Sequence, residues 1–292
     1  MWLPWQDGYE IAIALVVFVL VFRWTQRRWV VVAVATATEA AIVMTLYSTW
    51  QYIHDLTVTK TKGAISNAHR LWRFERWLHL PSEAWLEKVF INNRPIMDFV
   101  NVYYDTVHVP AAGALLIWMF VRHRDQYSKV RTVFALEIAG CLAIQATVPL
   151  APPRFLPDLG FVDAALKYGL SVYGTGGSGI SNELAAMPSL HVGWALLVGY
   201  AVCTISTSKW RWLILLHPIL TILAVTITAN HWWLDGVVAG IILIVCYGIV
   251  HVAELVWQAA KHRYGFGAAA TVDAEPDDDG PTAAERPLTN VT

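Results

Sequence analysis

The sequence predicts an all-α, polytopic membrane helix bundle, and three observations support this prediction. Hydrophobic residues make up 56% of the 292 residues, charged residues make up only 15%, and the mean hydropathy is +0.46. The apolar residues are grouped into runs close to the ~20 residues that a helix needs to cross a bilayer. Tryptophan is abundant, with 15 residues, and many of these lie near the ends of the apolar runs, as is typical of membrane interfaces.

Seven apolar runs follow one another along the chain. They lie at about residues 8–23, 29–52, 97–121, 131–149, 189–206, 211–229 and 232–257. The first run is followed by Arg23, Arg27 and Arg28 rather than by small residues, so we expect an uncleaved span and not a cleavable signal peptide. We therefore assign residues 1–53 to N-terminal transmembrane spans and residues 97–262 to a transmembrane core.

Basic residues flank alternate connections between these runs. The connections concerned lie after the first, third, fifth and seventh runs, and each carries arginine or lysine. The positive-inside rule then places these connections and the C-terminus in the cytoplasm, and the N-terminus outside. We expect a multi-pass protein of the cell (plasma) membrane, in which the connections at 53–96 and 150–188 lie on the extracytoplasmic side.

Two further segments differ from the apolar runs. Residues 54–96 are predicted to be interfacial, because Leu71, Phe74 and Leu78 recur at helical spacing with arginines between them. Such a helix either caps the bundle at the membrane surface or also attracts anionic lipid headgroups. Residues 268–292 are acidic and rich in proline and alanine, so we expect a disordered tail.

Composition also limits the partners and cofactors. The net charge of −1 gives no indication of a nucleic-acid partner. Cys141, Cys203 and Cys246 all fall within apolar runs without metal-ligand spacing, so we expect no metal and no cofactor. Glu39 lies within the second run, where an isolated carboxylate is unusual, and the sequence indicates no partner for it.

The candidate catalytic residues lie in the second half of the chain. M-P-S-L-H ends at His191, H-W-W-L-D joins His231 to Asp235 across one helical turn, and Arg154 follows the fourth run. The topology places all four on the extracytoplasmic side. A histidine with a carboxylate partner is suited to nucleophilic attack, a second histidine to proton transfer, and a guanidinium to phosphate oxygens. This combination favours phosphoryl transfer through a histidine.

Other residues are candidates for the substrate-binding site. Ser189 is either the N-cap of the fifth run or a phosphate contact, and the two roles are compatible. Asn230 precedes His231 and either caps the last run or contacts substrate. Tyr104 and His108 lie near the outer part of the third run; a hydrogen-bonded bundle residue is the simpler interpretation of His108. Lys167 is either solvent-exposed or a second phosphate-binding cation.

These residues resemble the three signature motifs of the type-2 phosphatidic acid phosphatase superfamily: P-P-R-F, P-S-L-H and H-x-x-x-D. The resemblance covers about Pro95–Val256. It implies a six-helix core, here with an extra N-terminal span and interfacial helices. It also implies that Arg154 binds phosphate, His191 is the general acid, His231 is the nucleophile and Asp235 orients it. A phosphohistidine intermediate and no metal are expected from the same resemblance.

The sequence departs from the phosphatase branch of that superfamily at several positions. Thr147 stands where the first motif has lysine, and Phe155 follows the arginine instead of proline. Leu190 replaces the glycine of the second motif, and Ala224 and Val225 replace the Ser-Arg pair of the third. The pattern looks closer to the inositol phosphorylceramide synthase and sphingomyelin synthase branch, which also lacks that pair.

Two further stretches resemble bacterial members of that inositolphosphotransferase-like group. They are Y-D-T-V-H-V-P, which contains Tyr104 and His108, and G-F-V-D at Gly160–Asp163. We therefore expect a phosphotransferase that acts on a lipid phosphate or phospholipid and passes the group to an alcohol acceptor. Hydrolysis of a polyprenyl or phosphatidic phosphate, with water as acceptor, is the alternative. A proton-coupled transporter is a remote alternative, because transporters tend to place such residues near the midplane.

Overall fold

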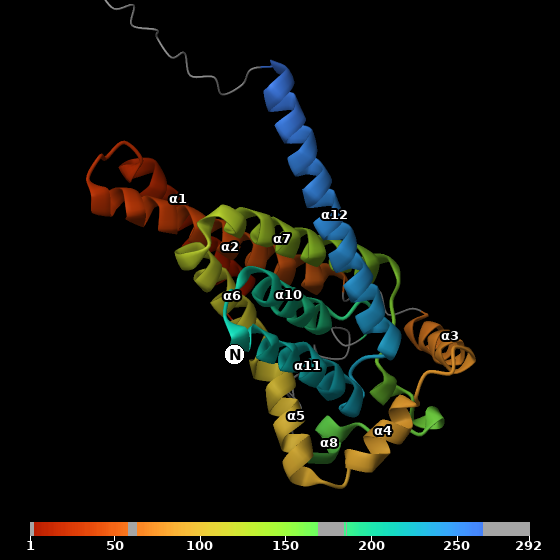
Figure 1. Ribbon diagram of the computed structural model, residues 1–292. Helices are drawn as coiled ribbons and strands as arrows, with labels where there is room; N and C mark the ends of the chain where they lie inside the picture. Colours follow the sequence, from red (N-terminus) through yellow and green to blue (C-terminus); the bar gives the residue numbers. More distant parts are fainter. Residues whose placement is uncertain (1–2, 58–62, 169–183, 185, 265–292) are drawn as a thin grey trace, which may run out of the picture. The chain divides into compact units, whose positions relative to one another are not determined.

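The computed structural model of the chain describes residues 3–57, 63–168, 184 and 186–264 (Figure 1). Apart from an isolated bridge at Leu150, the regular secondary structure in these ranges is helical, so the all-α prediction is confirmed. The chain divides into two units, Met1–Val250 and His251–Thr292. Within the described ranges, the second unit contains the last turns of the C-terminal helix. The predicted tail at 268–292 lies outside the described residues.

The two N-terminal helices pack against each other. α1 spans Trp5–Phe22 and α2 spans Arg28–Thr57. Gly8 favours their close approach, because a Cβ there would overlap the Ser48 hydroxyl of α2 unless that side chain moved. Both helices are long and apolar enough to cross a membrane.

The segment after α2 forms a helix, as expected, and small residues of this helix pack against the bundle. α3 spans Ala64–Trp77 and buries Ala68. Phe74 and Leu78, which the sequence assigned to the apolar face together with Leu71, are exposed. Small side chains at Ala64 and Ala68 allow the close approach of a loop, which is seen in the hydrogen bond from Ala151 N–H to Ala64 O (3.3 Å). Leu71 and Trp72 are partly buried beside them, so the packed face of α3 combines small and apolar residues.

The predicted third span is broken. α4, Glu83–Phe90, leads into α5, Arg94–Thr106, and α6, His108–Arg122, and α5 and α6 meet at an angle of 46°. Pro110 explains the break, because it lacks an N–H and its ring crowds the carbonyl four residues earlier, at Thr106. The break places His108 at the first position of α6.

α7, Arg124–Thr147, begins seven residues earlier than the predicted span at 131–149. It follows α6 after the single residue His123, and it packs against both α6 and α2. Arg131 of α7 donates to the carboxylate of Glu39 in α2. This ion pair supplies the partner of Glu39 that the sequence did not indicate.

The remaining helices complete the core. α10 spans Leu190–Ile205, a 3-10 helix at Lys209–Leu215 leads into α11 at Leu216–Ile227, and α12 spans Trp233–Tyr264. α10 packs against α6, α7 and α11 (Figure 1). The described residues contain five helices of membrane-spanning length and composition, or six if α5 and α6 form one span. The predicted fifth span, α10, has only 16 residues, or roughly 24 Å against the ~30 Å of the hydrocarbon core. The chain is a multi-pass membrane protein.

Candidate active site

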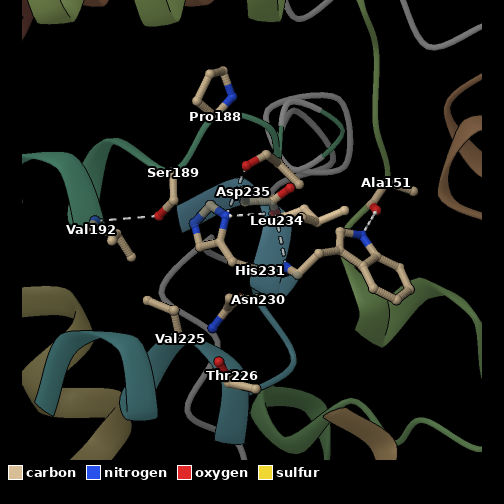
Figure 2. A network of polar contacts seen from close by, with 12 residues as sticks. Ala151, Pro188, Ser189, Val192, Val225, Thr226, Asn230, His231, Leu234 and Asp235 are labelled. Carbon is tan, nitrogen blue, oxygen red and sulfur yellow. Dashed lines mark hydrogen bonds and ion pairs between the residues drawn. The ribbon is translucent and has the colours of Figure 1, made fainter. Parts of the chain in front are cut away.

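Three connecting segments are tied together by backbone hydrogen bonds beside α10. Leu150 N–H donates to Leu184 O (2.9 Å), and Ala186 N–H donates back to Leu150 O (3.0 Å). Trp232 joins them from the start of α12, because its indole Nε1–H donates to Ala151 O at 3.0 Å (Figure 2). These bonds bring the segments after α7, before α10 and before α12 to one place.

Ser189 is the N-cap of α10, as the sequence predicted. Its Oγ accepts the N–H of Val192 at 3.4 Å, and its own N–H donates to the backbone oxygen of Asp235 at 3.2 Å (Figure 2). The side chain of Ser189 is fully buried. His191 is the second residue of the helix, so it stands among the N–H groups of the first turn, where the helix dipole favours an anion.

His231 is held by two acceptors on the same ring nitrogen. Its Nδ1 lies 2.8 Å from the carbonyl oxygen of Ala186 and 3.3 Å from Oδ2 of Asp235 (Figure 2). A carbonyl oxygen can only accept a hydrogen bond, so Nδ1 carries a proton. In the neutral imidazole the lone pair therefore lies on Nε2, and this tautomer is inferred from the hydrogen bonds.

Asp235 is fully buried and accepts a second hydrogen bond, from Trp232 N–H to Oδ2 at 2.9 Å. The backbone before it is tightly turned, because Ala229 has a positive φ of 53° and both Asn230 and His231 donate their N–H groups to Val225 O. The turn and the carboxylate together fix the direction of the His231 ring.

Three aromatic rings lie around the ring of His191. The ring centroid of His191 lies 4.4 Å from that of Tyr104, 4.9 Å from that of His108 and 5.9 Å from that of His231. His108 also uses both ring nitrogens within the bundle, at 3.0 Å from Tyr104 O and 3.2 Å from Thr221 Oγ1. These two hydrogen bonds agree with the predicted role of His108 as a hydrogen-bonded bundle residue. Its ring also lies next to that of His191.

Arg154 is buried next to the turn that carries His231. Its backbone N–H donates to Ala229 O at 3.0 Å, and its guanidinium donates to the Oδ1 of Asn230. Asn230 in turn donates to Thr228 Oγ1 at 2.7 Å. Asp163 Oδ2 lies 4.0 Å from Arg154 Nε. Asn230 therefore contacts the arginine rather than capping α12.

The eight candidate site residues thus occupy one region of the first unit. They are Tyr104, His108, Arg154, Ser189, His191, Asn230, His231 and Asp235. Lys167 does not join them, because its Nζ donates to Ile91 O and to Asn92 Oδ1 (3.0 Å) near the start of α5. The described residues contain no group of three or more His, Cys, Asp or Glu side chains that could hold a metal ion.

One buried carboxyl group next to the site was not indicated by the sequence. Glu75 of α3 is fully buried, and its Oε1 accepts the N–H of Leu234 in the first turn of α12 at 2.9 Å. Burial and the neighbouring carboxyl of Glu83 raise the pKa of Glu75 to about 9. Arg76 Nη2 donates to Glu83 Oε2 at 3.1 Å. A charged residue in an arginine-rich surface helix gives no sequence signal for such burial.

The fold and the site together define a helical membrane protein with two histidines, a buried carboxylate and a buried guanidinium around one region. A family model described as the PAP2 superfamily matches residues 69–249, which is more than half of the chain, so the protein belongs to that superfamily. Searches of curated proteins and of solved structures found no match. The match begins within α3 and leaves α1 and α2 outside it.

Family membership fixes the general class of activity. The protein is an enzyme of phosphatase or phosphotransferase type that acts on lipid phosphate. Membership favours an enzyme over the transporter that the ionisable residues alone left open.

Proposed function

We propose that the protein is a membrane lipid phosphotransferase, which passes a phosphoryl group or a phosphorylated headgroup from a lipid donor to an alcohol through a phosphohistidine at His231. The observation that carries this proposal is the pair of acceptors on His231 Nδ1, Ala186 O at 2.8 Å and Asp235 Oδ2 at 3.3 Å. They leave the Nε2 lone pair for attack on phosphorus.

The first half-reaction forms the phosphoenzyme. His231 Nε2 attacks phosphorus, the bond from phosphorus to the lipid oxygen breaks, and His191 donates a proton to that oxygen. The ring of His191, 5.9 Å from that of His231 between centroids, leaves room for a phosphorus between the two. The modified His231 keeps its Nδ1 proton and becomes cationic, and the buried carboxylate of Asp235 stabilises it.

The second half-reaction returns the enzyme to its starting state. The acceptor alcohol gives its proton to His191, its oxygen attacks phosphorus, and the bond from phosphorus to Nε2 breaks. Positioned acid–base groups of this kind typically contribute about 10²–10⁴-fold. Arg154, held by Asn230, neutralises non-bridging oxygens in both steps. The first turn of α10 provides N–H groups and Ser189 its hydroxyl group for the same oxygens. Tyr104 and His108 form the wall of the site beside His191.

Transfer is favoured over hydrolysis by the residues that line the region. Ala224 and Val225 are buried apolar residues where a phosphatase of this superfamily has a Ser-Arg pair. Trp232 is fully buried next to His231. Fewer polar groups and a bulky apolar neighbour favour a dry site that limits water as an acceptor. Hydrolysis of a polyprenyl or phosphatidic phosphate is the alternative activity of the same residues.

We further propose that the site lies at the extracytoplasmic face of the cell membrane and that the C-terminus is cytoplasmic. The basic residues around the α6–α7 connection support this orientation. A cysteine introduced at Lys88, which is exposed in α4, should react in intact cells with a membrane-impermeant thiol reagent, whereas one at Ser128 in α7 should not. The reverse labelling pattern contradicts the orientation.

The partition between transfer and hydrolysis is measured directly. Purified protein receives radiolabelled phosphatidylinositol, phosphatidic acid or polyprenyl phosphate, with and without alcohol acceptors such as ceramide, diacylglycerol or inositol. We expect a new phosphodiester or phosphomonoester of the added alcohol to exceed free phosphate or free headgroup. If only hydrolysis products form with every acceptor, at a kcat/KM of about 10⁴ M⁻¹s⁻¹ or more, the enzyme is a phosphatase.

A further inference from the structure

An apolar cavity of about 310 Å³ lies in the core beside α10. Its walls come from four helices, α2, α6, α7 and α10, and from Leu3, which precedes α1. The α2 wall extends over Val43–Trp50, the α6 wall over Val109–Leu116 and the α7 wall over Arg131–Ile138. Each of these stretches advances seven residues, or roughly 10 Å along its helix, about a third of the ~30 Å hydrocarbon core. The volume lies at the lower end of the range that is typical of ligand pockets.

The cavity begins next to the candidate active site. Val109 follows His108 directly, and Trp194 stands three residues after His191, which is about 4.5 Å along α10 and 60° around it. If the phosphate of a ligand lies at His191, the ligand atoms that are a few bonds away from the phosphate therefore lie near Trp194.

The wall holds a buried indole hydrogen, on Trp194, that no described residue accepts. Tyr47 donates its hydroxyl to Leu3 O at 2.9 Å, and the charge of Arg131 is balanced by Glu39. The indole Nε1 of Trp194 is buried and has no hydrogen-bond partner among the residues that the structure describes. A buried donor without an acceptor costs about 1–3 kcal/mol, so a ligand acceptor at this depth would be stabilised.

We propose that this cavity binds one ester-linked acyl chain of a glycerophospholipid substrate, with the ester carbonyl accepting the hydrogen of Trp194 Nε1. The inference rests on the proposed function, because it places the substrate phosphate at His191. An ester carbonyl lies a few bonds from the phosphate of a glycerophospholipid, whereas a polyprenyl phosphate has no acceptor at that depth. The rest of the chain fills the apolar part of the cavity against α2, which lies outside the family match.

A second apolar cavity, of about 390 Å³, lacks this feature. It is lined by Val192 and Leu196, which lie about 160° around α10 from Trp194. The indole donors on its wall are already used, because Trp232 donates to Ala151 O and Trp233 to Pro81 O. We therefore assign the ester contact to the first cavity.

Gly113 allows the cavity to be filled selectively. It lines the cavity, and a Cβ built at this position meets no atom within 4 Å, so a side chain can begin there without a clash, and Gly113→Leu should reduce the space in the cavity. Gly248 of α12 is a matched control: it is also helical, a Cβ there also meets nothing within 4 Å, and it does not line the cavity. Both substitutions replace a helical glycine by the same better helix former.

The chain-length test compares kcat/KM for long-chain and short-chain phosphatidic acid in mixed micelles. We expect Gly113→Leu to lower the long-chain to short-chain ratio about three- to tenfold, a modest change because the micelle offers the chain an equally apolar alternative. Gly113→Ala should lower it less, and Gly248→Leu should leave it at the wild-type value. An unchanged ratio in Gly113→Leu, or an equal fall in Gly248→Leu, overturns the proposal.

The linkage test compares diester with diether phosphatidic acid of equal chain length. Trp194→Phe keeps an aromatic ring but removes the N–H. We expect wild type to prefer the diester about three- to tenfold in kcat/KM, and Trp194→Phe to bring this ratio close to one. A ratio that does not change in Trp194→Phe overturns the ester contact. If wild type turns over polyprenyl phosphate but no glycerophospholipid, this inference is wrong while the proposed function stands; if no lipid phosphate reacts, the proposed function fails as well.

Discussion

Asp235→Asn separates two contributions that a carboxylate can make to a catalytic histidine. One is to hold the proton on Nδ1, so that Nε2 keeps its lone pair. The other is to stabilise the positive charge of the phosphorylated ring. In this protein the carbonyl of Ala186 lies closer to Nδ1 of His231, at 2.8 Å, than Asp235 Oδ2 does, at 3.3 Å. The proton should therefore stay on Nδ1 when the carboxylate is replaced by a neutral amide.

The expected loss then corresponds to one charge-assisted hydrogen bond. Hydrogen bonds to charged groups contribute about 1.5–3 kcal/mol, which corresponds to a loss of about 10- to 150-fold in the rate of phosphoenzyme formation. The asparagine side chain in this variant keeps an oxygen that can accept the N–H of Trp232, so the turn before α12 should persist. Single-turnover measurement with radiolabelled donor, quenched at short times, gives this rate directly.

The control for this experiment is His231→Gln, which removes the nucleophile and should leave no phosphoenzyme. If Asp235→Asn is as inactive as His231→Gln, the carbonyl of Ala186 does not hold the proton and the reasoning about the tautomer is wrong. A loss of less than about threefold instead shows that the carboxylate does not stabilise the charged ring.

Three further predictions concern the surroundings of the site. Arg154→Lys removes the planar guanidinium that Asn230 holds and should lower kcat/KM by about 10²-fold in steady-state assays; a change below threefold contradicts a phosphate-binding role. Gly193→Ala should lower the thermal unfolding temperature, because a Cβ there would overlap the buried Glu137 carboxyl, which would have to move. Gly113→Ala should have little effect; equal melting temperatures for both variants contradict this packing. Glu75 has its pKa raised to about 9, so between about pH 4 and pH 9 the folded protein holds a proton that the unfolded chain has lost. Glu75 should therefore contribute a fall in the stability of wild type as pH rises through this window, by at most about 1.4 kcal/mol per pH unit. Glu75→Gln should remove this contribution but not that of Glu87, whose pKa is raised to about 7 by burial; identical pH profiles of the two proteins contradict the raised pKa of Glu75.

Much of the fold was predictable because the bilayer restricts what a sequence can do. Apolar runs of fixed length give the helices, and Pro110 in the sequence accounts for the break between α5 and α6. The early start of α7 was not predictable from hydropathy, because its first seven residues include Arg124, Asp125 and Lys129, which are charged. The charge of Arg131 is accommodated within the bundle by Glu39, a residue far away in the chain.

The candidate site was predictable where it depends on ionisable residues in fixed spacing. His231 and Asp235 lie one helical turn apart, and the structure places them in contact. Two contacts next to these residues could not be predicted from the spacing of ionisable residues in the sequence. The acceptor at Ala186 is a backbone atom, which any residue provides, and the burial of Glu75 depends on the position of α3 against the first turn of α12. The catalytic roles themselves stay predictions.

The most direct test of the central claim is to identify the phosphorylated residue. The protein is incubated briefly with radiolabelled lipid donor, denatured at alkaline pH, at which phosphohistidine is stable, and digested for mass spectrometry. We expect an acid-labile phosphoryl or phospho-headgroup adduct on His231, which is absent in His231→Gln and longer-lived in His191→Ala when an alcohol acceptor is added. A covalent adduct on another residue, or turnover at the wild-type rate in His231→Gln, contradicts it.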